Sequence, residues 1–240
     1  MMKGFLALLA GALVVAVGIG LYVIFSLPQA AEPTPPAEID RTPIEQPVTL
    51  TPVTKIIGQS VEGRQITATT YGEGSTHLLF VGGIHGGYEW NSILLAYEIM
   101  DALEADLESI PDDMQITIVP NLNPDGLYVV TGLEGRFTLA DVPEPDIRIA
   151  AGRFNANDVD LNRNFACKWA PESTWRGEVV SAGTGPFSEP EAAALRDLVL
   201  AEQPDAVAFW HSQANNVYAS ECEAGVLPET IALMNTYATA

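Results

Sequence analysis

Basic residues are scarce in this sequence. Its 240 residues include 11 Lys and Arg against 31 Asp and Glu, which gives a formal net charge of −20 at pH 7. Proteins that bind nucleic acids hold the phosphate backbone with clustered Lys and Arg side chains. The shortage of positive charge therefore argues against a nucleic-acid partner, and the excess of acidic groups favours solubility.

Internal repeats are not evident, and there are only two cysteines, Cys167 and Cys222. The lack of a repeat argues against a solenoid fold. The cysteines form no CxxC pair, which argues against a structural zinc site built on thiolates. If the chain is exported to an oxidising compartment, an even number of cysteines instead predicts one disulfide, between Cys167 and Cys222.

Charged residues are missing from the segment Gly4 to Leu27, which is dominated by Leu, Val, Ala, Ile and Phe. As a helix, this segment is long enough to cross a bilayer core of ~30 Å. We therefore predict that residues 1–27 form an N-terminal transmembrane anchor, with Lys3 on the cytoplasmic side and the rest of the chain outside the cytoplasm. The alternative is a secretory signal peptide that is cleaved, although Pro28 and Gln29 make the best candidate cleavage site a poor one.

A proline-rich stretch, residues 28–52, follows this segment. Such a composition predicts an extended, solvated linker. The remaining residues, 53–240, are long and apolar enough to bury a core of their own. We therefore expect one catalytic domain there.

Strand-like and helix-like segments alternate along this domain. Period-two or continuous apolar runs predict strands, and apolar residues at three- and four-residue steps predict helices. The predicted strands are 64–71, 78–82, 114–119 and 205–210, and the predicted helices are 91–107 and one that begins at a capping box at 188–191. The sequence Asn-Pro-Asp-Gly at 123–126 predicts a type I turn, and residues 127–157 are expected to be irregular. Strands followed by helices indicate α/β layers with functional residues at strand ends.

Histidine is rare, with three in the chain. His85 and His211 each follow an apolar run, whereas His77 lacks such a context and is expected on the surface. Glu89 follows His85 by four residues, across a glycine pair that lets the backbone bend sharply. A histidine and a carboxylate directed at one spot are typical metal ligands. The ordinary alternatives are hydrogen-bonded core histidines and, for Glu89, a negative charge that favours a helix N-terminus.

Six motifs in a fixed order give this sequence a resemblance to a known family. They are GQSVEGRQI at 58–66, GGIHGGYEWN at 82–91, NPDG at 123–126, RFNANDVDLNRNF at 153–165, PFSEPE at 186–191 and FWHSQ at 209–213. Together they resemble the zinc carboxypeptidase A family of metallopeptidases, over about residues 58–240. The resemblance implies an α/β fold with a mixed β-sheet flanked by helices, and peptide hydrolysis that depends on one zinc ion.

The resemblance also implies roles for individual residues. His85, Glu89 and His211 match the three zinc ligands. Asp160 matches a carboxylate that holds a ligand histidine through its free ring nitrogen, a contact that fixes the tautomer of the histidine. The alternative for Asp160 is an ordinary turn residue.

Three further positions match residues that handle substrate charge in the family. Asn162 and Arg163 match the pair that grips the terminal carboxylate of a peptide, because a guanidinium can bind a carboxylate bidentately. Arg153 matches the arginine that stabilises the oxyanion formed by attack on the scissile carbonyl. The ordinary alternative for both arginines is an exposed or salt-bridged side chain.

The sequence departs from the family pattern in two respects. Three residues separate His85 from Glu89 where the family has two, and a glycine turn can absorb the extra residue. In the family, the general-base glutamate lies well downstream of the last ligand histidine, and no residue between His211 and Ala240 matches it. We therefore expect that the C-terminal part of the domain is missing.

Three functions are compatible with these features. The first is a zinc metallocarboxypeptidase that acts outside the cytoplasm on peptides with a free C-terminal carboxylate. The second is a catalytically impaired fragment or pseudoenzyme that binds zinc or peptides. The third is a zinc-dependent deacylase or amidase of small N-acyl amino acids. The LNRNF motif beside NPDG, together with the export signal, favours a peptidase over the deacylase.

Overall fold

The structure is a computed structural model that describes residues 51–143, 147–212 and 215–239. The predicted anchor, residues 1–27, and nearly all of the predicted linker, residues 28–52, lie outside the described residues and stay predictions. Within those described ranges, none of the helices has both the length and the apolar character needed to cross a membrane.

A five-stranded mixed sheet lies at the centre of the described domain, with the order β1-β2-β4-β3-β7. Its strands are β1 (Val53–Gln59), β2 (Gln65–Tyr71), β3 (Thr76–Val81), β4 (Met114–Val119) and β7 (Ala206–Phe209). β3 is parallel to both of its neighbours, β4 and β7, whereas β2 is antiparallel to both β1 and β4. Because β3 and β7 are parallel and adjacent, their carboxyl ends meet at the same edge of the sheet.

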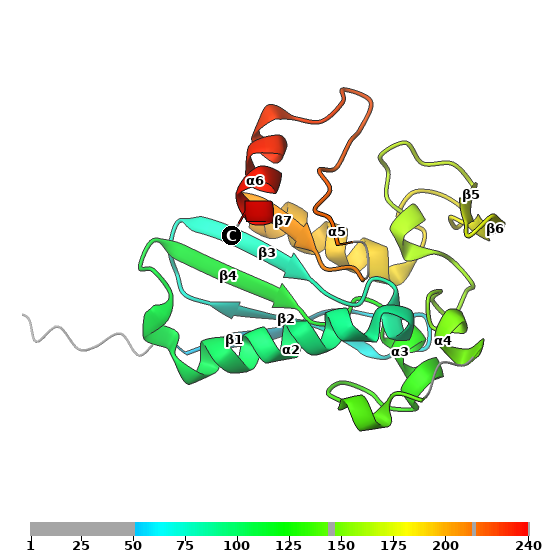
Figure 1. Cartoon of the computed structure of the whole chain (residues 1–240), viewed down its shortest axis with the longest axis horizontal. Coiled ribbons are helices and arrows are strands. Elements are labelled where there is room, and N and C mark those ends of the chain that lie inside the picture. The colour runs from blue at the N-terminus through cyan, green and yellow to red at the C-terminus, as the bar shows by residue number, and fades with distance from the viewer. Residues whose placement is uncertain (1–50, 144–146, 213–214, 240) are drawn as a thin grey trace, which may run out of the picture. The chain divides into compact units, whose positions relative to one another are not determined.

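The helices and a small second sheet surround this central sheet. The α-helices are α2 (Trp90–Ala105), α3 (Pro124–Thr131), α4 (Ile147–Ala151), α5 (Pro190–Glu202) and α6 (Pro228–Thr239), and the short 3-10 helices are η1 (Gly86–Glu89), η2 (Leu107–Ser109), η3 (Leu139–Asp141) and η4 (Leu161–Arg163). A two-stranded antiparallel hairpin is formed by β5 (Glu172–Trp175) and β6 (Glu178–Ser181). In Figure 1, this hairpin lies beyond the end of the sheet to which the strand arrows of β3 and β4 point.

Helices cover both faces of the central sheet, with α2 and α5 on opposite faces (Figure 1). Successive side chains of β3 point to opposite faces. Leu79 and Val81 belong to one buried cluster with Leu195 of α5, whereas Phe80 packs against a second cluster that contains Ala96 of α2. Burying such a side chain contributes about 1.5–3 kcal/mol relative to exposure. The result is a layered helix–sheet–helix core, which confirms the predicted mixed sheet flanked by helices.

The four predicted strands and both predicted helices are present within a few residues of their predicted bounds. The sequence reasoning missed β1 and the hairpin of β5 and β6. β1 is an edge strand whose residues are mostly exposed, and the strands of the hairpin are four residues each with mainly exposed side chains. Neither has the apolar pattern on which a strand prediction depends.

The predicted type I turn at 123–126 is wrong, because these residues begin a helix. Asn123 is the N-cap of α3, and its side-chain oxygen accepts a hydrogen bond from the backbone N–H of Gly126 at 2.9 Å. Pro124 occupies the first helical turn, where its missing N–H costs nothing. The predicted irregular segment, 127–157, is wrong in part for the same reason, since α3 continues to Thr131 and α4 lies within it.

The prediction that His77 is a surface residue is also wrong. Its side chain is buried on β3, and Nε2 lies 2.8 Å from the hydroxyl oxygen of Thr117 on the neighbouring strand β4. β3 has a partner strand on either side and helices on either face. A polar side chain in that position needs a partner within the protein, and Thr117 provides it.

Candidate metal centre

The chain turns sharply at the end of β3 and places His85 at the start of η1. Gly83 and Gly86 have φ values of +62° and +45°, which residues with a Cβ rarely adopt. A Cβ at Gly86 would also lie 2.7 Å from the backbone oxygen of Gly152. The glycines therefore allow a tight turn that is packed directly against other backbone segments.

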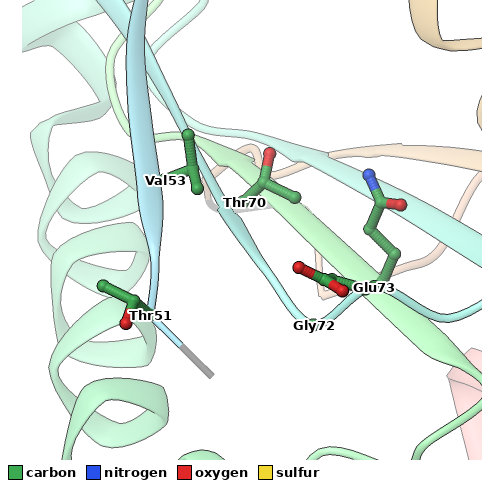
Figure 2. A pocket seen from close by; sticks show the side chains of 6 residues that line it. Thr51, Val53, Thr70, Gly72 and Glu73 are labelled. Atoms are coloured by element: carbon green, nitrogen blue, oxygen red, sulfur yellow. The ribbon is translucent and has the colours of Figure 1, made fainter. Parts of the chain in front are cut away.

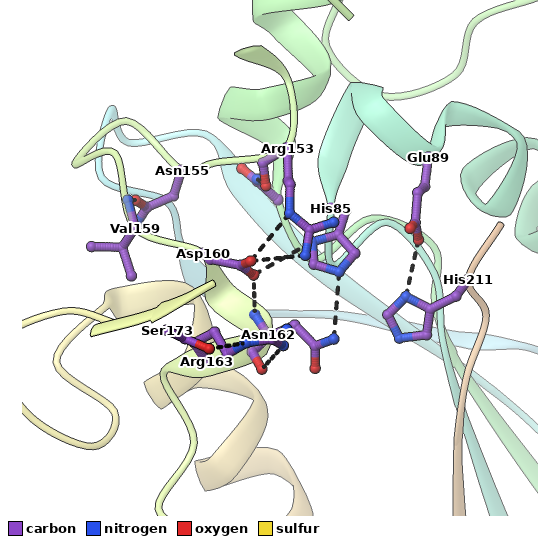
Figure 3. A network of polar contacts seen from close by, with 11 residues as sticks. His85, Glu89, Arg153, Asn155, Val159, Asp160, Asn162, Arg163, Ser173 and His211 are labelled. Carbon is purple, nitrogen blue, oxygen red and sulfur yellow. Dashed lines mark hydrogen bonds and ion pairs between the residues drawn. The ribbon is translucent and has the colours of Figure 1, made fainter. Parts of the chain in front are cut away.

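His85, Glu89 and His211 converge at this edge of the sheet (Figure 3). Each offers one nitrogen or carboxylate oxygen, and the three atoms lie within 4.8 Å of one another. His85 follows β3 and His211 follows β7, so the parallel pairing of the two strands brings the histidines together. Their ring centroids are 5.2 Å apart, and Nδ1 of His211 lies 3.0 Å from Oε2 of Glu89.

The extra residue between His85 and Glu89 is absorbed by a 3-10 helix. Glu89 is the last residue of η1, and His85 is its N-cap. The glycine turn expected from the sequence is thus a 3-10 turn, and α2 begins only at Trp90. A 3-10 helix has three residues per turn and a larger rise than an α-helix. It brings the Glu89 carboxylate back toward the end of β3 and opposite His211.

The His85 ring is buried and uncharged. Its side chain is 2% exposed, and its pKa is lowered from 6.5 to about 2, first by burial and then by the positive charges of Arg153 and Arg163 and by the neighbouring His211. A neutral imidazole keeps a lone pair on one ring nitrogen, which metal coordination requires. Its Nδ1 lies 3.6 Å from Oδ1 of Asp160, and its Nε2 lies 3.4 Å from the side-chain nitrogen of Asn162.

Asp160 is fully buried and connects several parts of the site (Figure 3). Its Oδ2 accepts hydrogen bonds from Nε and a terminal nitrogen of Arg153, at 3.1 and 2.8 Å. Its Oδ1 accepts from the backbone N–H of Asn162 at 3.1 Å, which caps η4. Asp160 is therefore more than a turn residue, because it orients Arg153, η4 and the side of the His85 ring that it faces.

The two arginines singled out in the sequence occupy different environments. Arg153 is 5% exposed, is paired with Asp160, and has its guanidinium carbon 4.7 Å from the ring centroid of Trp175. Arg163 is half-buried, and its Nε donates to the hydroxyl of Ser173 at 2.9 Å. Asn162 is exposed and lies beside His85. The structure thus brings Asn162, Arg153 and Asp160 to His85, and holds Arg163 on the hairpin.

A buried carboxylate pair, Glu189 and Glu191, is a feature that the sequence reasoning misread. The predicted capping box at 188–191 is wrong: the N-cap of α5 is Glu189, with no side-chain hydrogen bond to the helix. The amide of Asn155 donates instead to both carboxylates, at 2.8 and 3.1 Å, and the backbone N–H of Val61 donates to Glu191 at 3.0 Å. Burial raises the pKa of Glu191. These contacts anchor the segment that carries Arg153 and Asp160 to the start of α5.

Two other features lie apart from these residues. Cys167 and Cys222 form a disulfide, as the sequence predicted. Figure 2 shows a pocket lined by Thr51, Val53, Thr70, Gly72, Glu73 and Gln115. These residues lie near the amino ends of β3 and β4, whereas His85 follows the carboxyl end of β3. The pocket brings together one carboxylate and mainly neutral side chains, so it offers no set of metal ligands.

The donor set at residues 85, 89 and 211 fits zinc. Zinc binds imidazole nitrogen and carboxylate oxygen, and catalytic zinc sites have three protein ligands and one open position. The neutral state of His85 suits coordination, and the acidic partner Asp160 faces its other ring nitrogen, as metal-bound histidines require. The residues present therefore satisfy the chemical requirements of such a site.

Comparison with known proteins gives a consistent result. A family model described as zinc carboxypeptidase matches residues 46–232. Among curated proteins, the chain is 25% identical over 182 residues to gamma-D-glutamyl-L-diamino acid endopeptidase 1 of Lysinibacillus sphaericus, covering 68% of this chain and 46% of that protein. It is 30% identical over 122 residues to carboxypeptidase M of Mus musculus, covering 45% of this chain and 25% of that protein.

Solved structures resemble the described fold as well. Carboxypeptidase A from Helicoverpa armigera superposes with a TM-score of 0.59 and 21% sequence identity, covering 76% of this chain and 46% of that one. At this level of identity the likeness concerns the fold. The chain spans less than half the length of each of these relatives.

Proposed function

This chain belongs to the zinc carboxypeptidase family, and on that premise we propose that it is a zinc-dependent metallocarboxypeptidase that removes C-terminal residues from peptides. The observation that carries the proposal is the convergence of His85, Glu89 and His211 within 4.8 Å at the carboxyl ends of β3 and β7. In this proposal the three side chains hold one zinc ion. When bound, zinc polarises the scissile carbonyl and acidifies a water molecule.

Substrate recognition in this proposal depends on Asn162 and Arg163. Both belong to η4, which is capped by Asp160 beside the candidate metal ligands. A guanidinium fork binds a carboxylate more specifically than an ammonium group can. The position of Asn162, 3.4 Å from Nε2 of His85, supports a role next to the reacting bond.

Arg153 contributes positive charge close to the metal ligands. Its guanidinium is held by Asp160 and lowers the pKa of His85. An oxyanion that develops near His85 would be stabilised by this charge, because electrostatic interactions are strong where water is excluded. We assign no residue of the chain to the general base that a carboxypeptidase requires.

The proposed setting is extracytoplasmic. The uncharged segment Gly4 to Leu27 and the proline-rich residues 28–52 support an anchor and a linker ahead of a domain at 53–240. The disulfide between Cys167 and Cys222 supports the same setting, because disulfides persist in oxidising compartments.

An endopeptidase activity is a second candidate. The relative from Lysinibacillus sphaericus is named as an endopeptidase for a gamma-D-glutamyl-L-diamino acid bond, and its match covers 68% of this chain. The two candidates differ in whether a free C-terminal carboxylate next to the cleaved bond is required. Asn162 and Arg163, which suit a carboxylate, favour the carboxypeptidase.

Two measurements test the proposal. The zinc content of the purified chain should be one equivalent, and chelation should abolish hydrolysis. A panel of peptides with free or amidated C-termini, together with a gamma-D-glutamyl-L-diamino acid peptide, separates the activities by mass spectrometry. Release of single C-terminal residues from free-acid peptides alone is the expected result. Cleavage restricted to the gamma-glutamyl peptide would replace the carboxypeptidase by the endopeptidase, and zinc binding without cleavage of any peptide would indicate a binding protein.

A further inference from the structure

The β5–β6 hairpin touches the candidate site at three places, although the sequence analysis gave it no role. The hydroxyl of Ser173 on β5 accepts a hydrogen bond from Nε of Arg163 at 2.9 Å (Figure 3). The ring of Trp175, also on β5, lies 4.7 Å from the guanidinium carbon of Arg153. The backbone oxygen of Ser181 at the end of β6 accepts from the N–H of Asp160 at 3.0 Å.

All three contacts lead to η4. The Ser173 contact holds the side chain of Arg163 directly. The Ser181 contact fixes the backbone of Asp160, whose carboxylate caps η4 through the N–H of Asn162. The Trp175 contact holds Arg153, which is paired with that same carboxylate at 2.8 Å.

The Trp175 ring is itself fixed by aromatic neighbours. It packs edge-on against Tyr88 of η1, with ring centroids 5.2 Å apart, and against Phe154, with centroids 5.9 Å apart. Tyr88 directly precedes the candidate ligand Glu89. An aromatic ring that is held by other rings and faces a buried guanidinium restrains that guanidinium through a cation–π contact.

A guanidinium that recognises a carboxylate has to present its fork in one orientation. Arg163 makes its hydrogen bond to Ser173 with Nε, and its terminal nitrogen NH1 donates to the backbone oxygen of Asn162 at 3.1 Å. An unrestrained Arg side chain loses rotamer entropy when it binds, so fixing it in advance increases affinity. A hydroxyl is suited to this task because it accepts from Nε without neutralising the positive charge.

We propose that Ser173 and Trp175 are positioning residues, through which the β5–β6 hairpin orients Arg163 and η4 for recognition of a C-terminal carboxylate. This inference rests on the proposed carboxypeptidase function. In this inference, the β5–β6 hairpin, which is separate from the metal ligands in the sequence, determines specificity for free-acid substrates.

The test compares the binding of matched ligands to the zinc-loaded full chain. The probes are N-benzoylglycyl dipeptides that differ in their last residue, each as the free acid and as the C-terminal amide. Affinity is measured by calorimetry for a probe that is not cleaved and as KM for one that is. Ser173→Ala should reduce the preference for the acid over the amide about fivefold, the effect of one hydrogen bond. Ser173→Thr retains the hydroxyl and should retain the preference. Trp175→Ala should reduce it by a similar factor, and Trp175→Phe should restore most of it.

Thr174→Ala is the matched control, because it removes a hydroxyl from an exposed neighbour on the same strand. This variant should leave the preference unchanged. Arg163→Ala sets the scale for complete loss. Thermal unfolding of each variant separates a local effect from loss of the fold. If the chain hydrolyses the probes, Ser173→Ala should have a higher KM for free-acid probes than the wild type and nearly the same kcat.

The outcomes separate the two proposals. In one outcome, the wild-type chain prefers acids, but Ser173→Ala and Trp175→Ala keep the same preference as Thr174→Ala. That outcome overturns the hairpin inference and leaves the proposed function standing. If the chain prefers acids but hydrolyses none, the proposed function fails while the hairpin is still tested by binding. If no probe discriminates acid from amide, both are overturned.

Discussion

At the residue scale, the candidate site contains a buried pair of opposite charges, Asp160 and Arg153, beside the proposed metal ligands. Asp160 and Arg153 are almost completely buried, and they form an ion pair with each other. A buried charge without a partner is strongly unfavourable. Among the residues that the structure describes, Glu89 and His211, with their mutual 3.0 Å contact, and the neutral ring of His85 offer a cation its ligands at the centre of the site.

Replacing either proposed histidine ligand should abolish stoichiometric zinc binding. His85→Ala or His211→Ala leaves two ligands. Mutating a residue that only hydrogen-bonds to a metal ligand lowers metal affinity about 10- to 100-fold. Removing a ligand itself should therefore lower zinc affinity by more than about 100-fold. Zinc content and competition with a chelator measure this. His77→Ala is the control, because it also removes a histidine, but one that contacts Thr117 on β4 and is not among the candidate metal ligands. Full zinc binding by His85→Ala would contradict the assignment.

Glu191 should make stability depend on pH. Burial raises its folded-state pKa above the ordinary value of 4.5. The unfolded chain therefore releases this proton at lower pH than the folded chain does, and the free energy of unfolding falls as pH rises from 4.5 through the folded-state pKa. Below 4.5 both states are protonated and the effect disappears.

Urea unfolding of the wild type and of Glu191→Gln between pH 4 and pH 8 measures this effect, because the variant cannot ionise. The stability of the variant relative to the wild type should increase with pH across that range. Glu178→Gln, at an exposed position of β6, controls for the loss of one negative charge from an acidic chain. Parallel pH profiles for the wild type and Glu191→Gln would refute the expectation.

At the element scale, close backbone contacts between η1, α3 and α4 place the first metal ligands. A Cβ at Gly87 of η1 would lie 2.6 Å from the side chain of Val130 on α3, and a Cβ at Gly126 would lie 2.3 Å from the backbone oxygen of Gly152. Real Cβ atoms do not approach so closely. Glycine is therefore needed where these three short helices meet, for packing as well as for backbone conformation.

Gly86→Ala should cost substantially more stability than Gly63→Ala. Both glycines have positive φ, +45° and +84°, but a Cβ at Gly86 would meet backbone oxygens of Gly152 and Asn123 at 2.7 and 2.9 Å, whereas a Cβ at Gly63 meets nothing within 4 Å. The strain of positive φ alone costs about 1–2 kcal/mol. The added clash should raise the cost at Gly86 to about 3 kcal/mol or more, and zinc affinity should fall. Equal unfolding free energies for the two variants would show that the close packing is unimportant.

At the scale of the whole molecule, the disulfide connects distant parts of the chain. Cys167 lies shortly after Arg163 in the sequence, and Cys222 lies shortly after His211. The two cysteines are 55 residues apart. By the chain-entropy model, closing a loop of that length stabilises the fold by about 4 kcal/mol. The disulfide therefore ties the part of the chain that carries the proposed carboxylate-binding residues to the part that carries the last proposed metal ligand.

Removing this bond should destabilise the whole domain. The double variant Cys167→Ser and Cys222→Ser should lose about 4 kcal/mol of unfolding free energy in denaturant titrations. Adding a reductant should lower the stability of the wild type by a similar amount and leave the double variant unchanged. If the reductant has no effect on a wild type whose thiols are shown to be released, the stabilising role of the disulfide is refuted.

The sequence by itself determined the local elements of the core and the identity of the family. The continuous apolar run around Leu79 and the three- and four-residue spacing around Ala96 predict β3 and α2, because the side-chain period of a strand or a helix is written in the local sequence. The motifs around His85, Asp160 and His211 are sufficient to indicate zinc chemistry from the sequence alone.

Only the tertiary structure decided which of these residues meet. Four contacts join residues from different parts of the fold: Glu89 with His211 at 3.0 Å, Arg153 with Asp160, His77 with Thr117, and Arg163 with Ser173. Such contacts depend on the order of strands in the sheet and on the packing of short loops, which no local pattern specifies. The hairpin of β5 and β6 has no apolar pattern that would predict its strands, and its importance comes from the residues it contacts in the site.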